Sequence, residues 1–357
     1  MKYKSVLVTG GAGFVGSNLA VSWKLAFPGC RVIALDNLKR RGSEVNLRRL
    51  KSMGVEFIHG DVRNREDLEA IKFDLLIDCA AEPSVHAGTN GSNAYVINTN
   101  LVGTINSLDA ARQNDAAFLL LSTSRVYPIE RLNSVPYHET ETRFDWGDAG
   151  ELPGVCEHGV SELFPLEGAR SFYGASKLSA ELLVKEYSYQ WGMPALINRC
   201  GVLAGPWQMG KADQGVVALW VARHYFNRPL KYIGFGGHGK QVRDLLHIDD
   251  LFELIAAQAS SSEVWDGRVY NVGGGQDVSV SLAELTELCH AATGQEIDVT
   301  PEPETCKVDV RIYMTDSRKA REDFGWKPKR SALEIVNDIK TWIGENEPEV
   351  SHVLNSN

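Results

Sequence analysis

The stretch VLVTGGAGFVGSNLA, Val6 to Ala20, is the most informative segment of this 357-residue chain. An apolar run leads through three glycines, Gly10, Gly13 and Gly16, into a helical pattern. Glycines at this spacing allow a tight turn, a close approach of the backbone to a pyrophosphate and close packing of the helix on the strand. The N-terminus of the helix then attracts the anionic phosphates. This strand–turn–helix context predicts a dinucleotide site, which a bare glycine pattern would not.

Acidic residues end the next two apolar runs. Asp36 follows the last glycine by about 20 residues, where a carboxylate binds the ribose hydroxyls of adenosine. A carboxylate repels the 2′-phosphate of NADP, so NAD is the expected cofactor, although Lys39, Arg40 and Arg41 nearby temper that preference. Asp61 in HGDV ends the third run. We expect it beside the adenine, with a simple strand cap as the alternative.

The first half of the chain alternates apolar runs with helical patterns. The runs are SVLVTG, RVIALDN, VEFIHGDV, LLIDCAA and FLLLSTS. Runs that are apolar throughout, rather than at every second residue, are typical of parallel strands covered on both faces. We predict an α/β fold with a Rossmann-like, doubly wound parallel sheet over residues 1–200, including a long ordered loop at 128–170. Residues 201–345 are expected to form mainly a smaller substrate-binding lobe, interleaved with the first domain, and 346–357 a frayed tail.

The composition excludes several classes of protein. Hydrophobic residues make up 43% of the chain and charged residues 23%, which are values of a globular protein. A net charge of −9 argues against nucleic acid as a partner, and no run approaches the roughly 18 apolar residues of a membrane span. The six cysteines show no metal-ligand spacing, so we expect reduced thiols in a cytoplasmic protein. The acidic residues and histidine of RDLLHIDD are expected to cap a helix and form salt bridges rather than bind a metal ion.

A second informative stretch is RSFYGASKLSA, Arg170 to Ala180. It places Tyr173 and Lys177 one helical turn apart, on the same helix face. The alternative is an ordinary exposed pair. A tyrosine hydroxyl, with a pKa of about 10, is a poor base at neutral pH unless a nearby cation favours its ionised form. Beside a nucleotide cofactor, the pair therefore predicts a device that removes the proton of an alcohol during oxidation.

Together these motifs resemble the extended short-chain dehydrogenase/reductase family, the NAD-dependent nucleotide-sugar epimerases and dehydratases. The similarity covers essentially the whole chain and includes CAA, NxxGT at residues 100–104, STSRVY, YGASK and RDLLHIDD. It implies an enzyme that uses NAD and a nucleotide sugar, without a nucleic acid or membrane partner. It also implies a homo-oligomer, a dimer or a dimer of dimers, packed through the helix after Asn100 and the Tyr173 helix.

The resemblance assigns roles to individual residues. Thr123, four residues before the tyrosine of the Val-Tyr element, completes a catalytic triad with Tyr173 and Lys177, and Ser122 is the neighbour most easily confused with it. Tyr173 takes the proton of a sugar hydroxyl while hydride passes to NAD. Lys177 holds the nicotinamide ribose and, with the positive nicotinamide, favours the phenolate. The residues expected to bind NAD are Gly10, Gly13, Phe14, Val15, Asp36, Asn37, Arg40, Asp61, Val62, Ala80, Ala81, Asn100, Ser122, Tyr173 and Lys177.

The resemblance also implies a substrate site in which arginines grip the pyrophosphate, because a planar guanidinium binds phosphate oxygens bidentately. Arg243 and Arg311 are expected to be these clamps. No metal ion is expected. The residues expected to bind the substrate are Ser84, Arg125, Arg199, Gln214, Gln241, Arg243 and Arg311.

Departures from the family patterns narrow the reaction. Dehydratases of nucleotide sugars carry an Asp–Glu pair directly after the active-site threonine, whereas Ser124 and Arg125 follow Thr123 here. Dehydration is therefore disfavoured. The common 4-epimerases carry an asparagine where the segment RCGVLAGP has Val202, so the usual substrate anchor at that position is missing or rebuilt.

Three further segments, HETETRFDW, KADQGVVALW and GKQVRDLLH, are similar to the branch of the family that inverts C2 of a CDP-dideoxyhexose, CDP-paratose to CDP-tyvelose. The segment CAAEPSVHAG and Pro128 depart from that branch. The implied reaction oxidises C2 to a transient 2-keto sugar, which reorients and takes the hydride back on its opposite face. Two alternatives stand beside it: a C4 epimerase of another nucleotide sugar, such as a UDP-hexose, and a catalytically silent NAD-binding regulator.

Overall fold

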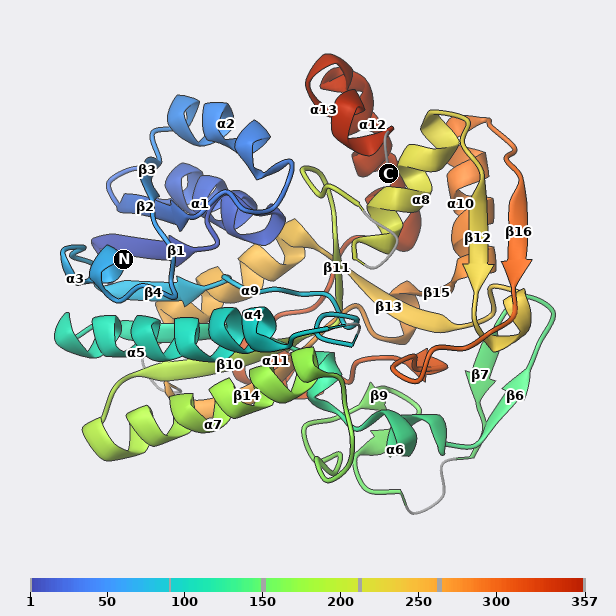
Figure 1. The fold of residues 1–357 in the computed structure, drawn as a ribbon. Helices are drawn as coiled ribbons and strands as arrows, with labels where there is room; N and C mark the ends of the chain where they lie inside the picture. Colours follow the sequence, from blue (N-terminus) through green and yellow to red (C-terminus); the bar gives the residue numbers. More distant parts are fainter. Residues whose placement is uncertain (1, 90, 149–151, 211–213, 262–264, 356–357) are drawn as a thin grey trace.

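The computed structural model describes residues 2–89, 91–148, 152–210, 214–261 and 265–355. A seven-stranded sheet lies at its centre in the order β14-β10-β5-β4-β1-β2-β3 (Figure 1), with every neighbouring pair parallel. This confirms the predicted doubly wound sheet. The strands are β1 (Ser5–Thr9), β2 (Arg31–Asp36), β3 (Glu56–His59), β4 (Leu75–Asp78), β5 (Ala117–Thr123), β10 (Ala195–Cys200) and β14 (Asp266–Val272).

Alternate side chains of the central strands face two helical layers. Val6 and Val8 of β1 belong to a core shared with α1 and α9, whereas Leu7 belongs to a core shared with α5 and α7. Because both faces of the sheet are buried, its strands carry no polar alternation. In Figure 1, α5 and α7 lie in front of the lower part of the sheet. The covering helices are α1 (Phe14–Ala26), α5 (Gly103–Gln113), α7 (Phe172–Trp191) and α9 (Ile248–Ser260).

The direction of the chain reverses between β1 and β4. From β1 it runs outward through β2 and β3, and it then returns to build β4, β5, β10 and β14 on the other side. Ligands of open α/β sheets bind at this switch point, outside the carboxyl ends of the strands. The expected site therefore lies where β1, β4 and β5 end.

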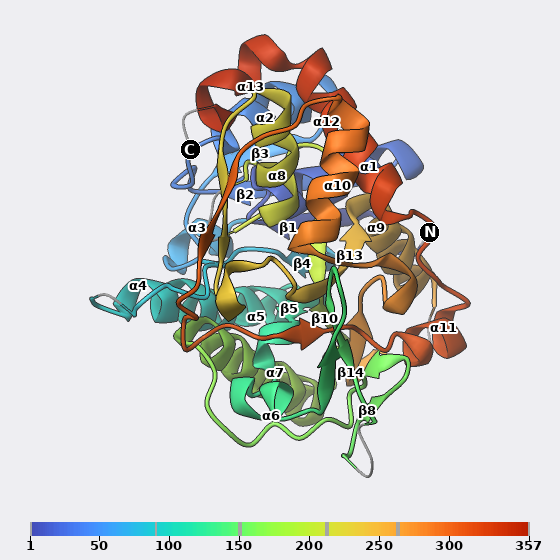
Figure 2. The same cartoon turned by 90° about the vertical axis from the view of Figure 1, so that its right-hand side faces the viewer.

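A smaller lobe packs beside this edge of the sheet (Figure 2). Its helices α8, α10 and α12 enclose a separate apolar core, and its strands form one mixed sheet and one parallel pair. Since β14 comes from the second half of the chain but lies in the central sheet, the two lobes are interleaved. The elements are β11 (Val202–Ala204), α8 (Val216–Tyr225), β12 (Leu230–Ile233), β13 (Val242–His247), β15 (Ser279–Ser281), α10 (Leu282–Thr293), β16 (Val299–Glu302), β17 (Ile312–Tyr313) and α12 (Ala332–Glu345).

The segment 128–170 contains no further strand–helix unit of the central sheet among its described residues. It forms one short helix and two small hairpins, namely α6 (Ile129–Asn133), β6 (Tyr137–Glu139) with β7 (Phe144–Trp146), and β8 (Val155–Cys156) with β9 (Gly159–Val160). The remaining short helices are α2 (Asn46–Ser52), α3 (Glu66–Glu69), α4 (Ala94–Ile97) and α11 (Arg318–Phe324).

The expectation of a frayed tail after residue 345 is wrong. Residues Glu347–Leu354 form helix α13, whose Val350, Val353 and Leu354 are buried in the core of the smaller lobe. Their spacing of three and four residues is that of one helix face. An ion pair of 2.7 Å between Arg48 and Glu349 joins this helix to α2. Across the described part of the chain, no helix is long and apolar enough to cross a membrane.

Candidate active site

Two adjoining cavities open at the carboxyl edge of the central sheet. The smaller, of about 510 Å³, lies over the glycine turn and the end of β2. The larger, of about 890 Å³, extends from Thr123 and Tyr173 into the smaller lobe. Because the cavities share wall residues, a ligand in one would meet a ligand in the other. The shared residues are Phe14, Val15, Cys79, Ala81, Pro83, Gln208, Gln214 and Gly215.

The glycine turn shapes the floor of the smaller cavity. Gly10 has a φ of +60°, which favours glycine, and a Cβ placed on Gly16 would lie 2.2 Å from the carbonyl oxygen of Gly10. Helix α1 begins at Phe14 without a side-chain cap, so the N–H groups of its first turn are left for another partner. This arrangement fits a pyrophosphate, whose charge the helix N-terminus stabilises.

Asp36 lies at the end of β2, on the wall of the same cavity. Its Oδ2 accepts the N–H of Ala12 at 3.1 Å and its Oδ1 that of Leu38 at 2.8 Å. Burial raises the pKa of this carboxyl, and the backbone hydrogen bonds act in the opposite direction. The carboxylate is thus fixed at the cavity wall, where it fits the ribose hydroxyls of an adenosine.

Most residues expected to bind NAD line one of the two cavities, but two do not. Asp61 forms a 2.5 Å ion pair with Arg63 and accepts a hydrogen bond of 2.9 Å from Asn37, a residue that itself lines the smaller cavity. The side-chain oxygen of Asn100 accepts a hydrogen bond from the N–H of Glu82 at 2.7 Å, which holds the loop after β4 in place. The lining residues are Gly10, Gly13, Phe14, Val15, Asp36, Asn37, Arg40, Val62, Ala80 and Ala81 in the smaller cavity, and Ser122, Tyr173 and Lys177 in the larger.

Sequence reasoning missed the segment that covers the smaller cavity from the other lobe. Trp207, Gln208 and Met209 form this cover. The amide of Asn18 donates to the Pro206 carbonyl at 3.0 Å, which ties the segment to α1. A Gly-Pro turn after β11 was the one local signal, and it gives no indication of which surface the turn covers.

The proposed proton-transfer residues meet in the larger cavity. Thr123 ends β5, and its side chain acts on the phenol of Tyr173, in the first turn of α7, by lowering the pKa of that hydroxyl. The neighbouring Ser122 instead donates to Glu181 at 2.5 Å. The structure therefore places Thr123, and not Ser122, beside the phenol. Lys177, one turn along α7, is almost fully buried.

Charged side chains surround Tyr173 and Lys177. Burial raises the pKa of the Tyr173 hydroxyl, whereas the hydrogen bond with Thr123 and the positive charge of Arg125 lower it. Burial lowers the pKa of Lys177, and the negative charges of Asp78 and Glu181 oppose that shift. Asp78 and Glu181 therefore favour the charged form of the lysine, and Arg125 contributes positive charge toward the phenol.

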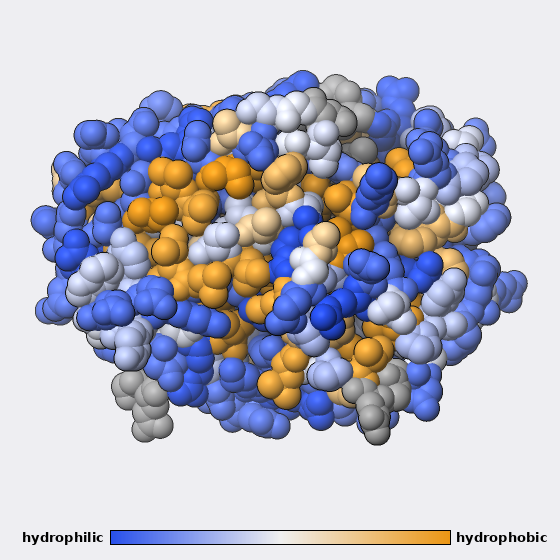
Figure 3. Space-filling model, turned by 60° about the horizontal axis from the view of Figure 1, so that its bottom comes forward, coloured by the Kyte–Doolittle hydropathy of each residue, from blue (hydrophilic) through white to orange (hydrophobic). Residues whose placement is uncertain are grey.

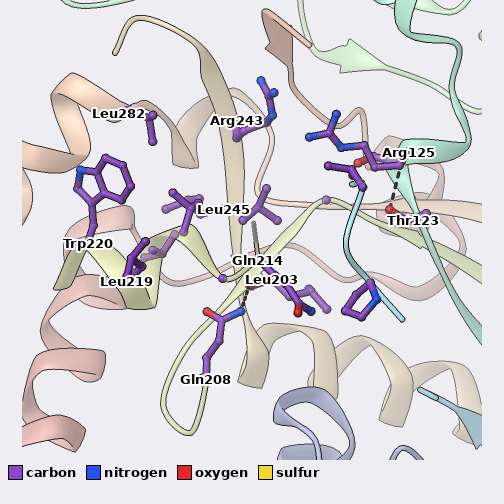
Figure 4. A pocket seen from close by; sticks show the side chains of 18 of the residues that line it. Thr123, Arg125, Leu203, Gln208, Gln214, Leu219, Trp220, Arg243, Leu245 and Leu282 are labelled. Atoms are coloured by element: carbon purple, nitrogen blue, oxygen red, sulfur yellow. Dashed lines mark hydrogen bonds between the residues drawn. The ribbon is translucent and has the colours of Figure 1, made fainter. Parts of the chain in front are cut away.

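The larger cavity joins an apolar end to a cationic end. Figure 4 shows Leu219, Trp220, Leu245 and Leu282 together on one side, Thr123 and Arg125 on the other, and Arg243 between them. Among the described residues of its wall, one carboxylate, Asp309, stands against five cationic side chains. These are Arg125, Lys177, Arg223, Lys231 and Arg243. In a chain of net charge −9, such a wall favours an anionic ligand with a planar apolar part.

Four of the residues expected to bind the substrate, Arg125, Gln214, Gln241 and Arg243, line this cavity. The guanidinium of Arg243 donates to the carbonyls of Val242 at 2.7 Å and Val310 at 2.5 Å, which fixes its direction. Burial lowers the pKa of Arg243 to about 9, and repulsion from Arg125 adds to that shift. An anion between these two arginines would relieve that repulsion.

The expectation that Arg199 binds the substrate is wrong. Its guanidinium is buried under β10 and pairs with Glu181 at 2.7 Å, and Nη1 donates to the Tyr127 hydroxyl at 3.1 Å. It therefore faces the interior, outside the wall of either cavity. A strand residue points to one face or the other, and a motif does not reveal which.

Ser84 and Arg311 also lie outside the cavity walls, in contrast to the prediction. The Ser84 hydroxyl accepts the N–H of His86 at 3.2 Å and serves the turn in which it lies. The guanidinium of Arg311 lies 3.9 Å from the centre of the Tyr137 ring. Arg311 supports the clamp differently, because its carbonyl accepts a hydrogen bond from Arg243 at 3.4 Å.

The cluster in RDLLHIDD has structural partners. His247 caps α9 by accepting the N–H of Asp249 at 3.1 Å, and Asp250 pairs with Arg330 at 2.5 Å. Within the described ranges, no group of three or more His, Cys, Asp or Glu residues is arranged to hold a metal ion.

Comparisons with known proteins agree with this geometry. CDP-paratose 2-epimerase of Salmonella typhi is 32% identical over 348 residues, covering 94% of this chain and 98% of that protein. The structure of UDP-glucose 4-epimerase from Thermotoga maritima with UDP-glucose matches with a TM-score of 0.76 at 26% identity, covering 96% of this chain and 99% of that one. The complex of UDP-glucose 4-epimerase from Thermus thermophilus with NAD gives 0.75 at 27% identity, covering 95% and 99%.

The cofactor of such proteins fits the smaller cavity. NAD would place its pyrophosphate at the uncapped start of α1 and its adenosine ribose at Asp36. Residues 6–273 match the NAD dependent epimerase/dehydratase family. On this match and on the relatives above, the chain belongs to the NAD-dependent epimerase/dehydratase family, and NAD is its cofactor.

Proposed function

We propose that this chain is a nucleotide-sugar epimerase that inverts C2 of a CDP-dideoxyhexose, CDP-paratose to CDP-tyvelose, through a transient 2-keto sugar. The observation that carries the proposal is the larger cavity, which joins Tyr173 to an arginine-lined region and an apolar end. A sugar at Tyr173, a diphosphate at Arg243 and a base near Trp220 would occupy these three regions in the order in which a nucleotide sugar links them.

Elimination of water is disfavoured by the side chains next to Thr123. The cavity presents Ser124 and Arg125 where a dehydratase needs an acid and a base, and neither can serve. The one carboxylate of the described wall, Asp309, favours the charged forms of Arg125 and Arg243. The site therefore supports oxidation and reduction at one carbon, without loss of a leaving group.

NAD bound in the smaller cavity supplies the acceptor and donor of hydride. The protein's own residues move the proton: Tyr173 takes it from the C2 hydroxyl as the carbon is oxidised and returns it when the carbon is reduced. Thr123 hydrogen-bonds the same oxygen, and Lys177 would hold the nicotinamide ribose. Arg243 keeps the diphosphate bound while the sugar turns, and the open space of about 890 Å³ provides the room for that rotation.

The specificity for C2 and for a CDP-sugar draws its support from the similarity to CDP-paratose 2-epimerase. To test this specificity, the purified protein is incubated in deuterated water with CDP-paratose and, separately, with CDP- and UDP-hexoses, and the products are followed by NMR. Inversion at C2 of the CDP-sugar without deuterium uptake supports the proposal. Inversion at C4 of a UDP-hexose would replace it with the 4-epimerase alternative, and deuterium at the inverted carbon would indicate deprotonation at carbon instead of hydride transfer.

We further propose that two copies pair through α5 and α7, in a reducing compartment such as the cytoplasm. Three large hydrophobic side chains of α7 are exposed to solvent: Leu182 by 57%, Tyr189 by 84% and Trp191 by 55%. Exposed hydrophobic side chains that gather on one surface are typical of a protein–protein interface. Figure 3 shows hydrophobic side chains gathered on the side of the molecule that carries these helices. Light scattering tests the pairing: the wild type should have the mass of a dimer or a larger oligomer, and Leu182→Glu a smaller mass. The same mass for both proteins would refute pairing through this surface.

A further inference from the structure

The two cavities meet in a passage that a bound dinucleotide has to cross. Asp36 lines only the smaller cavity, and Tyr173 lines only the larger. NAD bound with its adenosine ribose at Asp36 and its nicotinamide near Tyr173 therefore runs along the wall that the cavities share. Most side chains of this shared wall are apolar, and Gln208 and Gln214 are the two of its described residues that carry an amide.

The amide of Gln208 is fixed before any ligand binds. The residue is 9% exposed, and its Nε2 donates to the Leu203 carbonyl at 3.1 Å. Gly215, which has a φ of +76°, lies so close that a Cβ placed on it would come within 3.2 Å of Cδ of Gln208. Gln214, in contrast, is only partly buried. Gln208 is thus the rigid amide of the passage.

The oxygen of this amide is left without a donor. Oε1 of Gln208 is buried and has no hydrogen-bond partner among the residues that the structure describes. If the amide turned over, its oxygen would face the carbonyl oxygen of Leu203, and two acceptors repel each other. In Figure 4, the amide nitrogen is directed to Leu203 and the oxygen points away from it. Because an unpaired buried acceptor costs free energy, this oxygen favours a ligand that brings an N–H or O–H group.

The backbone of Gln208 is tied to the lobe that carries the glycine turn. Asn18 of α1 donates to the Pro206 carbonyl at 3.0 Å and accepts a hydrogen bond from Arg49 at 2.7 Å. The guanidinium of Arg49 in turn lies 4.7 Å from the centre of the Trp207 ring. The free oxygen is therefore held at a defined place relative to α1, whose first turn fits the pyrophosphate.

The donor groups of NAD that can meet this oxygen belong to one half of the molecule. The pyrophosphate, at the start of α1, offers acceptors and no donor. The donors of the adenosine half lie at the Asp36 end, outside the larger cavity. The groups that remain for the passage are the ribose hydroxyls and the carboxamide N–H of the nicotinamide half.

We propose that Gln208 is a binding residue for NAD: its Oε1 accepts a hydrogen bond from the nicotinamide half and holds that half at the entrance of the larger cavity. The side chain thereby orients the part of the cofactor that faces Tyr173. This inference goes beyond the proposed function, because it does not depend on which nucleotide sugar the larger cavity binds.

The test measures cofactor binding by calorimetry on the full-length, NAD-free protein, without any nucleotide sugar. Gln208→Met keeps the size of the side chain and removes the acceptor. Gln241→Met is the matched control: Nε2 of Gln241 donates to the Ile233 carbonyl at 2.9 Å and its Oε1 is buried without a partner in the described part of the chain, but it lines only the larger cavity. The ligands are NAD, ADP, which lacks the nicotinamide half, and 3-acetylpyridine adenine dinucleotide, which lacks the amide N–H.

Gln208→Met should bind NAD about five- to tenfold more weakly than the wild type, the worth of one hydrogen bond, and should bind ADP equally well. Gln241→Met should bind both like the wild type. If the loss disappears with the acetylpyridine analogue, the carboxamide is the donor, and if it remains, a ribose hydroxyl is. Unchanged NAD binding in Gln208→Met would overturn the proposal, since the oxygen would then serve another ligand. An equal loss for NAD and ADP would also overturn it, because the side chain would then only hold the cover in place.

Discussion

Replacing Arg199 by methionine tests whether this arginine stabilises the fold or binds the substrate, as its sequence motif suggested. The side chains of Arg199 and Glu181 are 3% and 1% exposed, and the pair is joined at 2.7 Å. Removal of the guanidinium leaves the Glu181 carboxylate buried, with the Ser122 hydroxyl at 2.5 Å and the charge of Lys177 as its remaining partners. Breaking a buried pair in this way costs about 3–5 kcal/mol. At about 2 °C per kcal/mol for a large chain, Tm should fall by about 6–10 °C.

Thermal unfolding of the NAD-free protein, followed by circular dichroism, measures this loss. The double variant Arg199→Met/Glu181→Leu should recover most of it, because no uncompensated charge remains. Arg243→Met is the matched control, since its side chain lines the cavity and its loss should weaken nucleotide binding more than it lowers Tm. If Arg199→Met kept the wild-type Tm and instead weakened nucleotide binding, the buried-pair interpretation would be refuted.

Three further perturbations follow from the geometry. Tyr173→Phe should lower turnover by at least about 100-fold, the lower end of the range that a general base contributes, while NAD binding measured by calorimetry stays intact. A variant as active as the wild type would exclude the phenol as the base. Gly16→Ala places a methyl group 2.2 Å from a turn carbonyl, so NAD affinity should fall at least about tenfold, and unchanged affinity would contradict the tight turn. The ion pair with Arg63 holds the pKa of Asp61 in the folded protein well below its ordinary value. The pair therefore stabilises the fold fully above the unfolded-state pKa of about 3.9, and this stabilisation is lost as the pH falls toward the folded-state pKa of Asp61. Urea unfolding at several acidic pH values should show this loss in the wild type and not in Asp61→Asn, and identical pH dependence of the two would argue against it.

Local patterns predicted the parts of the fold and site that local geometry dictates. The glycine turn at Gly10–Gly16 needs its residues for backbone reasons, and the structure shows a tight approach at that point. Tyr173 and Lys177 share a helix face because of their spacing, and Arg243 reaches the cavity from a strand end. These features depend on a few neighbouring residues, so a sequence motif contains most of the information.

Features that depend on long-range packing could not be predicted in this way. Arg199 turns inward because Glu181, on a helix that crosses its strand, offers a buried partner. The wall formed by Trp220 and Leu282 comes from two helices of the smaller lobe, which pack against each other although about 60 residues separate them. Helix α13 escaped prediction because three apolar residues in a polar stretch gain stability only from the core on which they pack.

The central claim, that the hydride leaves and returns to the same carbon, is tested most directly with a substrate labelled at that carbon. CDP-paratose carrying deuterium at C2 is incubated with the protein and NAD in ordinary water, and the product is examined by NMR and mass spectrometry. The account predicts CDP-tyvelose that is inverted at C2 and retains its deuterium. An inverted product that has exchanged the label for solvent hydrogen would contradict it.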